Sequence, residues 1–195
     1  MKRLFKLTSL FMTMILVLQA MPNIANAATR IYWYKKMING GSICYWVDSG
    51  VSYTTAIRNA ETEIELPAAG YSNPMKLSKT TTKSSSQMDF YQVNNSNTSA
   101  IASTYSYRQN SATPMAVSDK DNYDWYWCKI ELNKALMKNY TPSKRATLIV
   151  HEMLHAYGGK DTYSSDQISS IMYGYSSGTA TGVTKDANNF LNAKY

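Results

Sequence analysis

The sequence predicts an α+β fold, in which several short strands precede one long helix and a second helix closes the chain. Three observations support this class. Short segments rich in β-branched and aromatic residues are separated by glycine, asparagine and proline, as is typical of strands. Residues 53–65 carry apolar side chains at helical spacing before Pro67. Residues 142–157 form a continuous helix-favouring segment between Thr141 and Gly158.

Five segments fit the strand pattern. The first two flank Asn39-Gly40-Gly41, a sequence typical of hairpin turns. The third and fourth lie within residues 78–113, a region rich in Ser, Thr, Asn and Gln. We interpret them as strands with polar outer faces rather than as a disordered stretch. The strands are expected at residues 30–37, 43–47, 88–93, 100–107 and 125–132.

Three segments fit helices. The helix over residues 53–65 would bury side chains that recur three or four positions apart. In the long helix, Thr141 can cap the first turn and Pro142 suits the first helical position. Residues 184–195 are expected to form the C-terminal helix. The chain has no internal repeat and no linker, so we expect one domain.

The N-terminus has the three parts of a secretory signal peptide. Basic residues at positions 2, 3 and 6 precede an apolar run over residues 7–20, and Ala25-Asn26-Ala27 supplies a small-x-small cleavage pattern. The run is shorter than the ~20 residues that a membrane anchor needs. We therefore expect a signal peptide over residues 1–27 and a secreted, extracellular domain over residues 28–195, without a membrane span.

The net charge and the length of the mature chain exclude few classes of binding partner. Removing the signal peptide, which contains three basic and no acidic residues, leaves 168 residues and lowers the net charge from +7 to +4. This modest excess is compatible with association with an acidic cell wall, although a solvated basic face is the commoner meaning. No arginine clusters alternate with aromatic residues, so nucleic-acid binding is not expected. We expect a monomer.

Cys44 and Cys128 are the only cysteines in the chain. In an oxidising compartment a lone pair usually forms a disulfide, and neither cysteine belongs to a Cys-x-x-Cys motif. We therefore predict a Cys44–Cys128 disulfide, with two free buried thiols as the alternative.

The strongest functional signal begins at His151. The chain has only two histidines, His151 and His155, and Glu152 follows the first. Positions i and i+4 of a helix share one face, so both imidazoles can reach one zinc ion, and Glu152 can act as a general base on a water there. The alternative is that both are structural histidines on an amphipathic helix. This is disfavoured, because both histidines of the chain occur at the spacing that a metal site needs.

A catalytic zinc takes three protein ligands and leaves the fourth position open. No third histidine exists, and no glutamate follows Glu152. The downstream carboxylates are Asp161, Asp166 and Asp186. Asp161 is favoured, because Gly158 and Gly159 can end the helix in a left-handed turn that brings the chain back beneath the metal.

With this spacing the chain resembles the metzincin metallopeptidases. Their motif is H-E-x-x-H-x-x-G-x-x-H, and some secreted bacterial members have Asp in the last position. The matching residues are His151, Glu152, His155, Gly158 and Asp161. The chain is most similar to small matrixin-like or snapalysin-like catalytic domains.

A second segment, Ser170-Ile171-Met172-Tyr173, looks like the methionine turn of the same family. The resemblance implies that Gly158 and Met172 support the site without binding metal and that Tyr173 and Tyr175 are candidates for the substrate pocket. Some metzincins have a tyrosine ligand two residues after the methionine, where this chain has Gly174.

The resemblance implies a twisted mixed sheet with an active-site helix and a C-terminal helix. It further implies a secreted endopeptidase with one catalytic Zn²⁺, in which Glu152 activates a zinc-bound water. An edge strand, here residues 100–107, would pair with an extended protein or peptide substrate. Ca²⁺ is bound by many secreted members, but no calcium-loop pattern is present in this chain.

Two alternatives come from other functional classes. The 16 tyrosines and four tryptophans suggest a secreted cell-wall or carbohydrate-binding protein that bears zinc without protease activity, since aromatic rings can stack on sugars. The other is an inactive enzyme relative used for adhesion or inhibition. The aromatic residues are spread through predicted strands, where packing is their commoner use, and sugar binding would not explain the zinc motif. Glu152 argues against the inactive relative, because a non-catalytic site has no need of a base.

Overall fold

The computed structural model describes residues 30–111 and 113–195, so the predicted signal peptide lies outside the described residues. Its one described sheet has the strand order β2-β1-β3-β5-β4. The strands are β1 (Ser42–Val47), β2 (Lys76–Lys79), β3 (Met88–Val93), β4 (Ala102–Tyr107) and β5 (Trp127–Asn133). The helices are α2 (Thr54–Glu65), α3 (Lys134–Met137), α4 (Pro142–Tyr157) and α5 (Lys185–Lys194). The α+β prediction is confirmed at this level.

The sheet is mixed. Strand β1 pairs in parallel with β2 and β3, and β3 pairs in parallel with β5. Strand β4 is antiparallel to β5 and forms one edge of the sheet. An edge strand has backbone N–H and C=O groups without partners on its outer side. The expected position of this strand at an edge is therefore confirmed.

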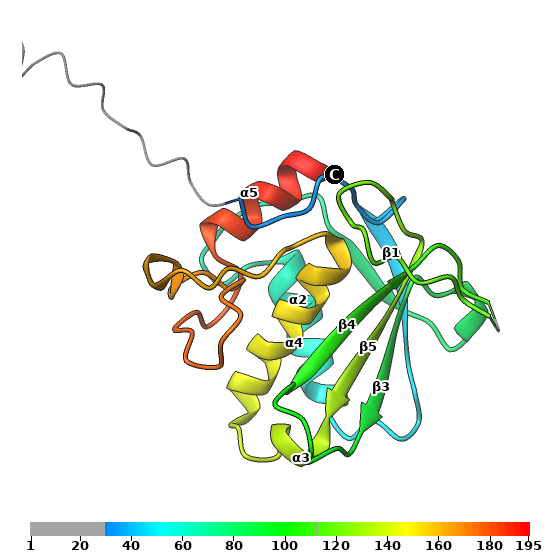
Figure 1. The fold of residues 1–195 in the computed structure, drawn as a ribbon, viewed down its shortest axis with the longest axis horizontal. Helices are drawn as coiled ribbons and strands as arrows, with labels where there is room; N and C mark the ends of the chain where they lie inside the picture. Colours follow the sequence, from blue (N-terminus) through cyan, green and yellow to red (C-terminus); the bar gives the residue numbers. More distant parts are fainter. Residues whose placement is uncertain (1–29, 112) are drawn as a thin grey trace, which may run out of the picture.

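Helices α2 and α4 cover one face of the sheet (Figure 1). They do so because their apolar residues recur at helical spacing and meet the alternate, inward-facing residues of the strands. Truncating one such side chain to alanine costs about 2–5 kcal/mol of stability. This core contains the buried residues Ile57, Ile64, Met88, Phe90, Ile130, Ile149 and Met153. No helix of the described residues is long and apolar enough to cross a membrane.

The first expected strand is wrong. Residues 30–37 form only single bridges, Tyr32 with Gly159 and Met37 with Trp125, so the predicted hairpin does not form. Two carboxylates from a distant loop bind the backbone instead: Asp121 accepts a hydrogen bond from Tyr34 N (2.9 Å) and Asp124 one from Lys36 N (2.9 Å). Strand β2 was missed because Lys-Leu-Ser-Lys is short and polar.

The predicted Cys44–Cys128 disulfide is also wrong, since both thiols are free. Strand β3 lies between β1 and β5, which separates their backbones by about 10 Å, beyond disulfide reach. In register, Cys128 lies level with Met88 and Tyr45. Cys44 precedes Tyr45 and therefore points to the opposite face of the sheet.

Candidate metal centre

The ends of α4 agree with the local sequence. Thr141 Oγ1 accepts a hydrogen bond from Lys144 N (3.2 Å), and Pro142 occupies the first turn. At the other end Gly158 has φ 111°, a left-handed conformation that other residues rarely adopt. Gly159 N then donates to Leu154 O (2.7 Å), which closes a Schellman-type cap and turns the chain back.

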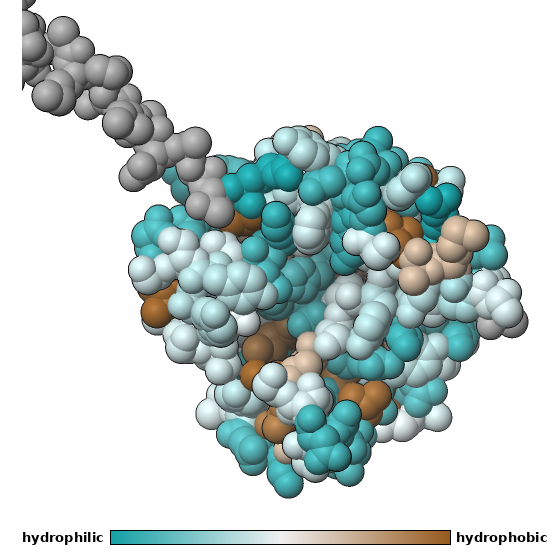
Figure 2. Space-filling view, in the orientation of Figure 1, coloured by the Kyte–Doolittle hydropathy of each residue, from teal (hydrophilic) through white to brown (hydrophobic). Residues whose placement is uncertain are grey.

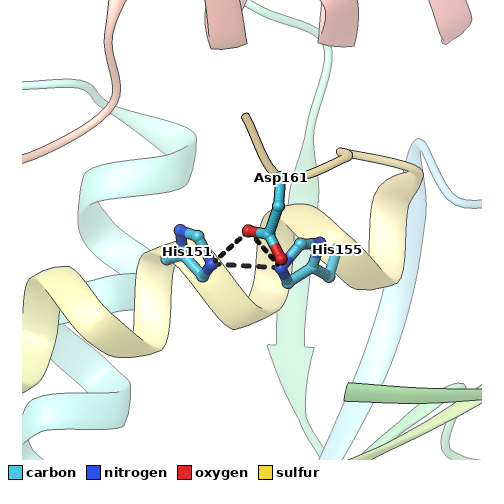
Figure 3. Close-up of side chains that lie close together, drawn as sticks. All are labelled: His151, His155 and Asp161. Carbon is cyan, nitrogen blue, oxygen red and sulfur yellow. Dashed lines mark hydrogen bonds and ion pairs between the residues drawn. The ribbon is translucent and has the colours of Figure 1, made fainter. Parts of the chain in front are cut away.

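This turn brings the three predicted ligands together (Figure 3). His151 Nε2 lies 3.1 Å and His155 Nε2 3.3 Å from Asp161 Oδ1. The two Nε2 atoms are 3.0 Å apart. The other downstream carboxylates are elsewhere: Asp166 is exposed, and Asp186 accepts a hydrogen bond from Ser170.

The hydrogen bonds around the imidazoles fit a cation. His151 Nδ1 lies 2.6 Å from Ile171 O, and His155 Nδ1 lies 2.9 Å from Gly159 O. Carbonyl oxygens only accept, so each Nδ1 carries a proton, and in the neutral form of each ring an Nε2 lone pair points inward. Two lone pairs and a carboxylate oxygen facing one another repel unless a cation lies between them. These three residues could hold a metal ion.

Asp161 Oδ1 supports the same conclusion. This buried oxygen accepts no hydrogen bond of acceptable geometry from the described residues, although two imidazole nitrogens lie nearby. Burial alone would raise the pKa of Asp161, but the imidazoles hold that pKa well below its usual range. Burial lowers the pKa of His151, but Asp161, Glu152 and the Ile171 carbonyl together raise this pKa above its usual value. The lowered pKa of Asp161 keeps its carboxylate ionised at neutral pH.

Met172 packs beneath the turn. It is fully buried, and its carbonyl oxygen accepts a hydrogen bond from Thr162 N (2.9 Å). A Cβ on Gly159 would lie 2.9 Å from both Met172 Cε and the backbone oxygen of Leu154, and because the backbone oxygen cannot easily move, this position favours glycine. Because Ile171 O holds His151, the methionine segment contacts both the helix and the turn that carry the ligands.

Glu152 is buried beside this group, on the face of α4 that meets β4. Its Oε2 accepts a hydrogen bond from Thr104 Oγ1 (2.7 Å) on the edge strand. That contact leaves Oε1 for another donor, such as a water in the cleft. Thr104 was not predicted as a site residue, because the contact joins residues 48 positions apart.

Three tyrosines line one wall. The predicted pocket residues Tyr173 and Tyr175 pack edge to face at 5.5 Å, and Tyr175 packs against Tyr163 at 5.1 Å. Tyr163, which was not predicted, donates a hydrogen bond to Asp161 Oδ2 (3.2 Å). A Cβ at Gly174 would overlap the Tyr163 ring, so glycine at this position makes room for that tyrosine.

The metal-ligand group and Glu152 line an open cleft of about 930 Å³. Strand β4 forms one wall, α4 forms the floor, and the segment after α4 forms the other wall. Figure 2 shows this face of the molecule hollowed between them.

Comparison of the chain with protein-family models found no match, and comparison with curated proteins found none either. The resemblance to metzincins therefore depends on the motif residues alone.

Proposed function

We propose that the protein is a secreted zinc-dependent endopeptidase of the metzincin type. The observation that supports this most strongly is the convergence of two imidazole Nε2 atoms and one carboxylate oxygen in an open cleft, beside a buried carboxylate that is not one of the three. Three protein ligands with an open fourth side are typical of catalytic zinc, whereas structural zinc takes four.

The ligand chemistry favours zinc over the other common ions. Ca²⁺ and Mg²⁺ prefer oxygen ligands, while two imidazoles and one carboxylate are a familiar zinc set. Both imidazoles donate Nδ1–H to backbone carbonyls, an arrangement that fixes the ring orientation and the tautomer.

A Zn²⁺ ion held by these residues would supply Lewis acidity and lower the pKa of water. Glu152 then accepts a proton from the attacking water through Oε1 and returns it to the leaving amine. Thr104 orients this carboxylate by binding Oε2. Tyr163 orients the Asp161 carboxylate in the same way from the rim of the cleft.

The substrate in this proposal is a protein or peptide bound in extended form. Residues 102–105 of β4 line the cleft at the sheet edge, so their outer backbone groups can pair with a substrate strand. The end of β4 already pairs with another segment, since Ser106 O accepts a hydrogen bond from Val117 N (2.8 Å). Such pairing with a substrate uses backbone hydrogen bonds, so it depends little on the substrate sequence. Any preference for a particular side chain must then come from the pockets of the cleft.

The deciding experiment measures zinc content and cleavage of casein or peptides for the secreted protein and for Glu152→Gln. We expect one zinc per chain in both proteins and a fall in kcat of about 10²- to 10⁴-fold in the variant. Glu131→Gln, on the opposite face of the sheet in an ion pair with Lys129, is the matched control and should keep full activity.

Chelation should abolish cleavage, and zinc should restore it. One zinc without cleavage in any variant would favour the cell-wall or carbohydrate-binding alternative. Absence of zinc in the folded protein would refute the metal centre itself.

A further inference from the structure

One cation in the cleft lies away from the metal centre. Among the described residues, the carboxylates that line the cleft are Glu152 and Asp161, both at that centre. Of the three lysines that line it, Lys120 and Lys160 lie near these two carboxylates, and Lys144 lies farther along α4. Among the described residues no carboxylate forms an ion pair with any of them. An extended substrate would therefore meet cations that the protein itself does not neutralise.

Lys144 is positioned to bind a side chain of the substrate. Helix positions 144, 148, 151 and 155 form one stripe along α4 that faces the cleft. Lys144 precedes His151 by seven residues, or about 10.5 Å along the helix. Its Nζ donates to Gly178 O (3.1 Å) on the opposite wall, which leaves two of its three N–H donors for a ligand.

The wall opposite Lys144 is held in place. Thr147 Oγ1 lies 3.1 Å from Thr181 O and 3.2 Å from Ser143 O in its own helix, and it shares its one proton between them. Helix and loop therefore meet at Lys144 and at Thr147 on this side of the metal centre. Leu148 and Ala180 are apolar residues that line the same cleft and are near these contacts in sequence. The ammonium thus closes a pocket with apolar sides, where a carboxylate would bind more strongly than at an open surface.

The direction of a bound peptide follows from contacts between β4 and α4. Ser106 and Ala156 O both lie near the Cys128 thiol, at 3.6 Å and 3.8 Å. Two residues earlier on β4, Thr104 contacts Glu152, four residues earlier on α4. Strand β4 and helix α4 therefore run in the same direction, and the start of β4 lies at the Lys144 end of the cleft.

A substrate strand antiparallel to β4 runs the opposite way. Antiparallel pairing is the commoner arrangement and the more stable per residue. Residues that follow the scissile bond would then extend toward Lys144. At about 3.4 Å per residue, the 10.5 Å along α4 corresponds to about three residues of extended chain.

We propose that Lys144 makes the cleft select an acidic side chain, Asp or Glu, at one of the three substrate positions that follow the scissile bond. This inference rests on the proposed peptidase function and names the substrate class for the same site. Glutamate is preferred to glutamine because only the carboxylate forms a charge-assisted hydrogen bond with the ammonium.

The test uses a cleaved peptide in which Glu, Gln or Lys is placed in turn at each of three positions on both sides of the scissile bond. For the wild type we expect kcat/KM to be about 10- to 100-fold higher with Glu than with Gln at one following position. Lys144→Met should remove this preference, and Lys144→Glu should reverse it in favour of Lys.

Lys138→Glu is the matched control, because Lys138 is exposed outside the cleft near the start of α4 and the change in net charge is the same. Circular dichroism verifies that each variant is folded. Equal rates for Glu and Gln at all following positions would overturn the inference, as would an equal loss of preference in Lys138→Glu.

A binding assay separates this inference from the proposed function. The same peptides are titrated into zinc-loaded Glu152→Gln, and their dissociation constants are compared. Tighter binding of the Glu peptide, lost in Glu152→Gln/Lys144→Met, supports the pocket even if the wild type cleaves none of the peptides. Cleavage without any acidic preference in rate or binding refutes the role of Lys144 and leaves the peptidase proposal intact.

Discussion

Zinc should stabilise the folded chain by a predictable amount. The three ligand atoms lie within 3.3 Å of one another in the fold, an arrangement that an unfolded chain does not hold. Zinc at about 100 times its Kd then adds about 2.7 kcal/mol to the free energy of unfolding. For a domain of this size each kcal/mol raises Tm by about 2–4 °C, so we expect a rise of about 5–11 °C.

The assay is thermal unfolding followed by circular dichroism, with zinc or with a chelator, between pH 7.5 and pH 5. Only neutral imidazole binds zinc, so protons compete with the metal. Asp161 raises the pKa of His151, which means that His151 protonates at a higher pH than a free histidine. The zinc-dependent rise in Tm should therefore shrink as the pH falls. Because the pKa of Asp161 is lowered, its carboxylate stays ionised throughout this range.

Asp161→Asn retains the shape of the ligand and removes its charge. We expect this variant to lose most of the zinc-dependent rise in Tm while remaining folded. Asp166→Asn, which changes an exposed downstream carboxylate, is the control and should keep the whole rise. An equal rise in both variants would show that Asp161 is not a ligand, and no rise in the wild type would show that the site does not bind zinc.

Three further predictions test contacts around the site. Thr104→Val removes the hydrogen bond to Glu152 and should lower kcat about tenfold with the zinc-dependent Tm unchanged, measured by steady-state kinetics. Gly158→Ala places a side chain at φ 111° and should lower the free energy of unfolding in urea by about 1–3 kcal/mol. Because Cys44 and Cys128 are free, reductant should leave Tm unchanged, and a thiol assay in denaturant should count two thiols.

The parts of the fold that sequence predicted correctly are those set by local interactions. The boundaries of α4 depend on Thr141, Pro142 and Gly158, each of which acts within one turn of its own position. The histidine spacing is equally local, because a helix fixes which residues share a face. For this reason the candidate ligands and the helix that carries them could be read from a short stretch.

The errors arise where distant segments decide the outcome. Residues 30–37 have the composition of a strand. Their backbone N–H groups, however, donate to Asp121 and Asp124 and not to a neighbouring strand. The disulfide prediction considered compartment alone, whereas the insertion of β3 between β1 and β5 separates Cys44 from Cys128. The order of strands in a sheet depends on the whole chain, and a local sequence pattern does not predict it.

Residues 30–37, which were wrongly predicted to form a strand, also explain how Asp161 is held in place outside α4. Trp33 N donates to Gly158 O (2.8 Å), and Lys160 N donates to Ile31 O (2.7 Å), on either side of the glycine turn. The segment thus fastens the turn immediately before Asp161, whose short side chain leaves little tolerance in backbone position. A strand at a sheet edge would have used the same N–H and C=O groups elsewhere. Because Ile31 and Trp33 bond to the glycine turn instead, they help to position Asp161, the third candidate ligand.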